Sequence, residues 1–111
     1  MTPNPSKDKE VFEFVVRALK KQKTKSEENG VCKYRSQFGK CAAGHLIKDE
    51  DYKKLFEGET VDPGNRIHAY FEELGYNTQL IRELQEVHDA YPTEKWPMMF
   101  EKVSSKLKIY E

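Results

Sequence analysis

The sequence lacks any apolar run that approaches the roughly 20 residues a helix needs to cross a bilayer. Its start, from Met1 to Asp8, is polar and contains two prolines, so it has no apolar segment typical of a secretory signal peptide. Only two cysteines are present, which argues against a disulfide framework. These absences predict a cytoplasmic protein whose two thiols remain reduced.

Apolar residues are scarce as well. Hydrophobic residues make up 37% of the 111-residue chain and charged residues make up 34%. A chain of this length has room for one modest core, so its apolar residues must lie on narrow faces of helices and strands. The sequence therefore predicts a single domain over residues 1–111, with residues 1–7 frayed.

Net charge is zero overall, but the charges are unevenly distributed. Residues 1–48 contain 11 Lys and Arg against 5 Asp and Glu, whereas residues 49–101 contain 5 against 13. Solvated helix faces are the commoner cause of such asymmetry, although an acidic region also attracts a basic protein surface. On this second interpretation, we expect a protein partner to contact acidic residues and exposed aromatic anchors of this region: Asp49, Glu50, Asp51, Tyr70, Tyr76, Tyr91 and Trp96.

The spacing of apolar residues predicts a mainly α (α+β) fold, with four to five short helices around one core and a small β-hairpin near residues 31–42. An apolar residue at every fourth position predicts the first helix over residues 8–22. The turn-forming pair Asn29-Gly30 then precedes an alternating segment that is typical of a short strand.

Start and stop signals predict the later helices. Residues 42–47 and residues 49–58 both have helical spacing. Asp62-Pro63 is typical of an N-cap followed by proline at the first helical position, and Gly75 is typical of a helix end. Two more helices are predicted at later signals, namely one capped by Asn77 and one beginning at Trp96-Pro97.

Two cysteines and a histidine, Cys32, Cys41 and His45, lie within one short segment. Thiolates and imidazoles are the ligands that structural zinc prefers, and it takes four of them. The fourth ligand in this interpretation is His88, which shares the apolar face of a predicted helix, with His68 as its substitute. We therefore expect the first three residues and His88 to converge around one zinc ion. Ordinary buried thiols are the alternative, because the spacing departs from the common zinc patterns.

Cys41 is also a candidate nucleophile for a cysteine-dependent enzyme. It precedes a predicted helix, whose dipole lowers a thiol pKa, and His88 is the candidate base. Asp89 would have to orient the His88 ring, but neighbouring residues on a helix point about 100° apart, which argues against this pair. The catalytic interpretation therefore remains an alternative.

Basic and aromatic residues also gather in the predicted hairpin, at Lys33, Tyr34, Arg35 and Lys40. Lysine and arginine neutralise phosphates, and a tyrosine ring stacks on a base, so this group predicts a nucleic-acid-binding surface. An ordinary surface hairpin whose tyrosine lies in the core explains the same residues. The sequence is compatible with both interpretations.

Four short patterns occur together in this chain. They are Cys32-x-Tyr34-Arg35, Gly39-Lys-Cys41-Ala-Ala-Gly-His45-Leu-Ile-x-Asp-Glu-x-Tyr52, Glu57-Gly58 and Leu84-Gln-x-x-His88-Asp89. In this combination the chain resembles a family of small uncharacterised proteins encoded in tailed-phage genomes. The resemblance covers most of the chain and implies a phage origin and a shared fold, without naming a reaction. It also implies that residues 32–52 and residues 84–89 belong together.

Many small phage proteins act by occupying a host protein. The resemblance therefore implies a non-enzymatic accessory protein that binds a host protein with a basic surface, in host takeover or counter-defence. Its expected location is the cytoplasm of the host cell.

Overall fold

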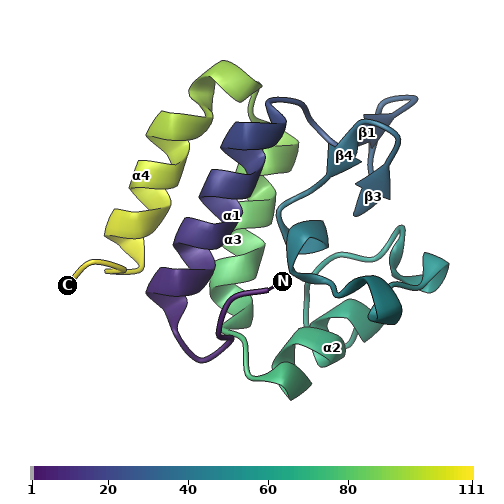
Figure 1. The fold of residues 1–111 in the computed structure, drawn as a ribbon, viewed down its shortest axis with the longest axis horizontal. Helices are drawn as coiled ribbons and strands as arrows, with labels where there is room; N and C mark the ends of the chain where they lie inside the picture. The colour runs from purple at the N-terminus through teal and green to yellow at the C-terminus, as the bar shows by residue number, and fades with distance from the viewer. Residues whose placement is uncertain (1) are drawn as a thin grey trace.

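The computed structural model describes residues 2–111, apart from the side chain of Leu55. This part of the chain contains four α-helices and two pairs of short antiparallel strands, which confirms the prediction of a mainly α fold with a small hairpin (Figure 1). The helices are α1 (Asp8–Gln22), α2 (Arg66–Leu74), α3 (Thr78–Ala90) and α4 (Trp96–Lys106). No helix of residues 2–111 is both long and apolar enough to span a membrane.

Helix α3 is the central element of the helical part. Helices α1 and α4 both pack against it, and α2 contacts it as well (Figure 1). Helix α1 forms over residues 8–22, as the apolar spacing predicts. The buried residues of α1 are Val11, Phe12, Val15 and Leu19, and those of α3 are Leu80, Ile81, Leu84, Val87 and His88.

Three helix boundaries agree with their sequence signals. The Asn77 side chain caps α3, because its oxygen accepts hydrogen bonds from the N–H groups of Gln79 at 3.1 Å and Leu80 at 3.3 Å. Gly75 ends α2 with a φ of +94°, in the left-handed region that glycine favours. Helix α4 begins at Trp96, as predicted.

The predicted start of α2 at Asp62-Pro63 is wrong, because the helix begins at Arg66. The Asp62 carboxylate accepts a hydrogen bond from the Thr60 hydroxyl and does not cap the helix. Glu59 takes this role from the preceding loop, since its carboxylate accepts the Arg66 N–H at 2.8 Å. A cap supplied from seven residues upstream has no local sequence signature.

The two strand pairs form small hairpins. Strand β1 (Glu27–Glu28) pairs with β2 (Val31–Cys32), and β3 (Arg35–Ser36) pairs with β4 (Gly39–Lys40). The β3–β4 pair is the hairpin predicted near residues 31–42. The Gln22 side chain at the end of α1 holds this hairpin, because it accepts the Lys40 N–H at 2.9 Å and donates to the Lys40 carbonyl at 2.8 Å.

Short 3-10 turns replace the helical structure predicted over residues 42–58. The turns are Ala43–Leu46, Asp49–Asp51 and Lys54–Phe56. Between the first two turns Ile47 is extended, and its carbonyl accepts a hydrogen bond from the Arg35 guanidinium at 3.1 Å. The helical prediction fails here because that carbonyl bonds to the hairpin instead of continuing a helix.

The prediction that residues 1–7 are frayed includes Met1, which lies outside the described residues. Within the described part, the Lys7 N–H donates to the Asn4 carbonyl at 3.1 Å and closes a turn before α1. The Asn4 side chain accepts from the Ser6 N–H at 3.1 Å in the same turn.

Candidate functional site

Residues 32–52 and residues 84–89 meet in space, because Gln85 on α3 accepts a hydrogen bond from the Ala43 N–H at 2.9 Å. His88 on α3 also accepts one, at 3.0 Å, from the N–H of Ser26, which precedes the first of these segments. Helix α3 therefore holds both the hairpin region and the turn that comes after it. Gln85 has a structural role that spacing alone did not indicate.

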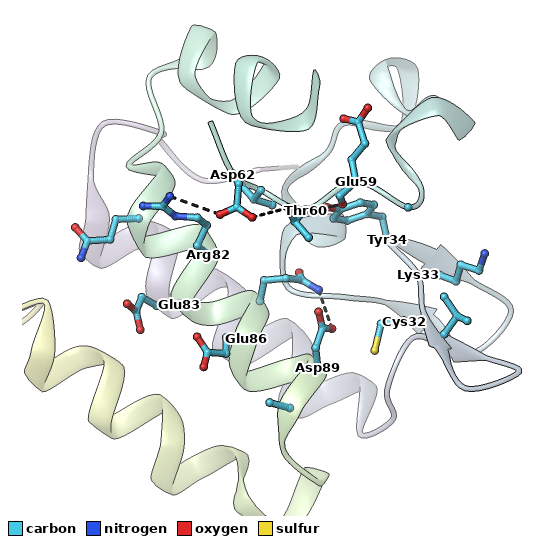
Figure 2. Close-up of a pocket in the computed structure, with 16 residues that line it drawn as sticks. Cys32, Lys33, Tyr34, Glu59, Thr60, Asp62, Arg82, Glu83, Glu86 and Asp89 are labelled. Atoms are coloured by element: carbon cyan, nitrogen blue, oxygen red, sulfur yellow. Dashed lines mark hydrogen bonds and ion pairs between the residues drawn. The ribbon is translucent and has the colours of Figure 1, made fainter. Parts of the chain in front are cut away.

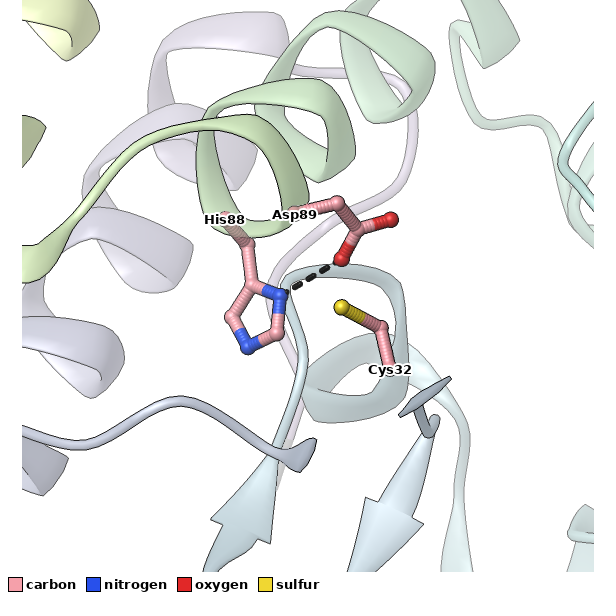
Figure 3. A group of neighbouring side chains, drawn as sticks. All are labelled: Cys32, His88 and Asp89. Atoms are coloured by element: carbon pink, nitrogen blue, oxygen red, sulfur yellow. Dashed lines mark hydrogen bonds and ion pairs between the residues drawn. The ribbon is translucent and has the colours of Figure 1, made fainter. Parts of the chain in front are cut away.

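Cys32, His88 and Asp89 form one cluster at the end of α3 (Figure 3). Their possible ligand atoms all lie within 4.8 Å of one another. The His88 Nδ1 atom lies 2.7 Å from the Asp89 carboxylate, which also accepts a hydrogen bond from Gln85 at 2.9 Å. The sequence argument against a His88–Asp89 pair is therefore wrong, because Nδ1 is the ring nitrogen nearer the backbone and a neighbouring side chain reaches it.

Both nitrogen atoms of His88 are occupied. A backbone N–H only donates, so the bond from Ser26 makes Nε2 an acceptor, and the proton of the neutral ring is on Nδ1, facing Asp89. The ring is 0% exposed and lies against Trp96, with 5.5 Å between ring centres. His88 therefore holds the Ser26 backbone in place, and neither of its nitrogens faces Cys32 as a free base.

The same hydrogen bonds bear on the zinc prediction. A metal ion at Nδ1 would displace the proton that now bonds to Asp89. A neutral ring would then carry its proton on Nε2, so two N–H donors, that of the ring and that of Ser26, would face each other. Zinc binding by His88 thus requires the Ser26 bond to break or the ring to become an anion. The cluster of Cys32, His88 and Asp89 is not arranged to accept zinc without this change.

The other predicted zinc ligands lie elsewhere. Cys41 is fully buried, and its Sγ atom accepts a hydrogen bond from the Gly44 N–H at 3.3 Å. His45 donates from Nε2 to the Gln22 side-chain oxygen at 2.9 Å. Among the described residues, neither these two nor His68 belongs to a group that could share one metal ion. Of the four predicted ligands, Cys32 and His88 therefore belong to the group of neighbouring ligand atoms.

Neither thiol is set up as a nucleophile. Burial, followed by the nearby Asp89 carboxylate, raises the pKa of Cys32 to about 11. Burial likewise raises the pKa of Cys41 above its usual value. Reactive cysteines need a lowered pKa and access to substrate, and Cys41 has neither. Cys41 is therefore an ordinary buried thiol in this structure.

One member of the predicted nucleic-acid surface, Tyr34, is buried. Tyr34 is only 6% exposed, and its hydroxyl donates to the Glu59 carbonyl, so its ring is not available for stacking on a base. The Arg35 guanidinium lies 2.8 Å from Asp49 and 4.5 Å above the Tyr52 ring. Lys40 and Lys33 complete the predicted set: Lys40 lies 3.7 Å from Asp49, and Lys33 borders a groove beside α3.

A carboxylate that spacing did not single out organises this region. Glu57 accepts hydrogen bonds from the N–H groups of Tyr34 at 2.9 Å and Arg35 at 3.2 Å, and from the Tyr52 hydroxyl at 2.6 Å. Three residues of the resemblance pattern thus share one carboxylate. Their pattern is explained by the folding of the hairpin, and a ligand is not needed to account for it.

The expected protein-binding residues are only partly available. Trp96 is 4% exposed and Tyr76 is 7% exposed, so the expectation that they are surface anchors is wrong. The Trp96 indole N–H donates to the Tyr91 carbonyl at 3.1 Å, which satisfies its polar atom inside the fold. The half-buried Tyr70 donates its hydroxyl to Asp51 at 2.8 Å.

The acidic residues of the same expected surface differ in exposure. Asp49 is exposed, but it bonds to Arg35 and Lys40. Glu50 is exposed as well, and Asp51 is half-buried beside Tyr70. The turn Asp49–Asp51 therefore has less unpaired negative charge than its three acidic residues suggest.

A groove of about 790 Å³ opens beside the Cys32 cluster, between α3, residues 31–34 and residues 58–62 (Figure 2). Carboxylates outnumber basic groups along its walls. The charged lining residues are Glu59, Asp62, Glu83, Glu86 and Asp89, against Lys33 and Arg82. We call this cavity the acidic groove.

The sequence predictions included neither wall of the acidic groove, although the helical wall does have a signal in the sequence. Glu83, Glu86 and Asp89 recur every three residues, which is typical of one face of a helix. The opposite wall comes from residues 58–62, whose path depends on the Glu59 cap and the turn at Asp62. Tertiary contacts of this kind are not visible in the order of residues.

The comparisons with known proteins assign no family to this chain. None of the protein-family models, curated proteins and solved structures compared with it matches. Function is therefore inferred from the chemistry of the groove and from the resemblance carried by the sequence patterns.

Replacing His88 with leucine is expected to lower the free energy of unfolding by about 1–3 kcal/mol, because the fully buried Ser26 loses the acceptor for its N–H. His88→Gln should cost less, since the glutamine side-chain oxygen can accept the same bond. Urea unfolding followed by the fluorescence of Trp96, the only tryptophan, measures both variants. Equal losses would show that the bond to Ser26 is not what His88 contributes.

Proposed function

We propose that this protein is a phage-encoded accessory factor that acts by binding a host protein, without catalysing a reaction, in host takeover or counter-defence. The phage origin is proposed from the resemblance of its sequence pattern. The binding role is proposed from one observation, the excess of carboxylates along the acidic groove. Its partner is a host protein with a basic surface.

The charge balance of the groove supports a basic partner. Five carboxylate and two basic side chains line it. Ion pairs join Asp62 to Arg82, Glu59 to Arg66 and Glu83 to Lys106, so Glu86 and Asp89 are the lining carboxylates that pair with no Lys or Arg among the described residues. Charges of one sign in a concave surface raise the local concentration of an oppositely charged partner. An exposed segment with lysine or arginine side chains fits this charge.

Two carboxylates of the helical wall are suited to a test. Glu86 is exposed and makes no ion pair with any described residue. Glu83 pairs with Lys106 on α4 at 2.7 Å, and surface pairs of this kind contribute only about 0–1 kcal/mol to stability. Changing both residues therefore alters the charge of the groove with little effect on the fold.

The alternatives have weaker support. An acidic groove repels phosphates, and Arg35 and Lys40 of the basic hairpin already contact Asp49. A cysteine-dependent enzyme needs a thiolate, whereas the pKa of Cys32 is raised to about 11 and Cys41 is in the core. Protein binding requires neither free phosphate-binding residues nor a reactive thiol.

The test is affinity capture from host lysate with three immobilised proteins: the native chain, Glu83→Gln/Glu86→Gln, and the matched control Glu72→Gln/Glu73→Gln on α2. The two exposed α2 residues lie outside the groove, so both variants change the net charge equally. We expect a host protein that the native chain and the control retain and the groove variant loses.

Three results would contradict the proposal. Equal retention by all three proteins would exclude the acidic groove as the contact. Loss from both variants would indicate attraction by net charge alone. Capture of no host protein by the native chain would contradict the binding role itself.

A further inference from the structure

A second groove, of about 560 Å³, lies between α1 and α4, and its lining is mainly apolar. Phe12, Val16 and Leu19 come from α1, and Trp96 and Phe100 come from α4. The α1–α4 groove shares no lining residue with the acidic groove. It is therefore a separate surface, and a binding role for it is independent of the proposed function.

The shape of the α1–α4 groove results from the helix packing. Helices α1 and α4 both pack on α3 (Figure 1), and residues of both helices line the groove. Its floor is well buried, since Leu19, Trp96 and Phe100 are 0–5% exposed. On the α1 side the lining extends from Phe12 to Lys23, which is about 16 Å at 1.5 Å per residue. This length equals about three turns of an α-helix.

We propose that the α1–α4 groove binds an amphipathic α-helix of a partner protein. A helix of about three turns matches the length of the groove and would place one apolar face, with side chains at i, i+3 or i+4, and i+7, against its floor. Tyr110 closes one end of the groove, where its ring packs edge-on against Phe12 with 6.0 Å between ring centres.

The charges along the groove specify this helix further. The α1 side carries Lys20 and Lys23, whereas Glu94 and Glu101 line the α4 side. A helix that fits has acidic residues on the flank beside α1 and basic residues on the flank beside α4. Charge complementarity of this kind selects both the partner and its orientation in the groove.

A second copy of this chain is not the occupant that these features favour. Among the described residues, the exposed large apolar side chains are Val31, Phe38, Leu74, Met98 and Tyr110. Only Leu74 and Met98 of these belong to helices, and they lie on different ones. No helix of residues 2–111 therefore presents an exposed apolar stripe that could enter the groove of another copy.

The test uses a labelled synthetic peptide of about 14 residues with leucines at i, i+3, i+4, i+7 and i+11, glutamates on one flank and lysines on the other. A second peptide carries lysines on both flanks, because a peptide with exchanged flanks could bind in the reverse direction, and a third has the composition of the first without the apolar stripe. Fluorescence anisotropy measures the binding of each peptide to the native chain. We expect the first peptide to bind at least about tenfold more tightly than the other two.

Three variants locate the binding surface. Val16→Lys places a charge among the lining residues, Lys20→Glu/Lys23→Glu reverses the exposed α1 side, and Leu74→Lys on α2 is the matched control outside both grooves. The first two should weaken binding about tenfold, and the control should leave it unchanged. The Lys20→Glu/Lys23→Glu variant changes exposed residues only, so the test does not depend on whether Val16→Lys folds.

Four outcomes would overturn the proposal. In the first, the peptide without the apolar stripe binds as tightly as the first peptide; in the second, Lys20→Glu/Lys23→Glu leaves the binding of the first peptide unchanged. In the third, a small apolar dye binds the groove but no peptide does. In the fourth, the native chain forms a dimer in sedimentation and Val16→Lys abolishes it.

Discussion

Replacing Gly44 with alanine is expected to destabilise the protein by about 3 kcal/mol or more, the upper part of the range for inserted groups in a packed core. A Cβ atom on residue 44 would lie far inside van der Waals contact with the Tyr34 backbone carbonyl oxygen. That oxygen also accepts the Cys41 N–H at 3.3 Å, which ties it to the start of the same turn. Neither side of the clash is a flexible side chain, so the backbone itself would have to move.

The sign of this prediction distinguishes packing from local propensity. In an exposed helical segment, exchange of glycine for alanine stabilises by about 1 kcal/mol. Gly44 lies in the 3-10 turn Ala43–Leu46, so propensity alone predicts a gain where the structure predicts a loss. Urea unfolding monitored by circular dichroism decides between them, because a rise in the midpoint would show that the turn does not approach Tyr34 closely.

Gly58 provides a matched control for Gly44. A Cβ atom at Gly58 would have no neighbour within 4 Å, and its φ of +84° is the only obstacle to a side chain. Gly58→Ala should therefore cost about 1 kcal/mol from backbone strain. A loss at Gly58 as large as that at Gly44 would argue against the steric explanation.

The parts of the fold that depend on local rules could be predicted from the sequence. Helix α1 needs only a repeating apolar stripe, and α3 needs a stripe and a cap at Asn77, so spacing located both. The two failures in the fold, over residues 42–58 and at the start of α2, each involve a side-chain bond that apolar spacing does not show. Arg35 takes the Ile47 carbonyl and interrupts a predicted helix, and Glu59 moves the start of α2. Such bonds depend on the completed fold.

The candidate site shows the same division. Spacing placed His88 on a buried face and associated it with Cys32, and the two lie in one cluster. It did not show that Ser26 occupies the second ring nitrogen of His88, which decides against a free base. The expectation that Trp96 is an exposed anchor used its residue type alone, although the indole lies against His88 in the core. Donors and burial supplied by distant elements set the chemistry of each group.

Leu84→Ala is expected to lower the free energy of unfolding by about 2–5 kcal/mol, a large share of the roughly 5–15 kcal/mol that stabilises a domain of this size. Leu84 is 0% exposed on α3, the helix that α1, α2 and α4 all contact. Because three helices rest on α3, none of them can move into the vacated space without losing its other contacts. The cavity should therefore persist, which places the cost in the upper part of the range.

The matched control for Leu84 is Glu86→Ala, two residues along the same helix and exposed. Both changes end in alanine and have similar effects on helix propensity, so the difference between them isolates burial. We expect the control to change the free energy of unfolding by no more than about 0.5 kcal/mol. An unchanged midpoint for Leu84→Ala, or equal shifts for both variants, would show that α3 does not direct this face into the core. The acidic groove would then lose its helical wall as well, because Leu84 and Glu86 are fixed on different faces of α3 by the same register.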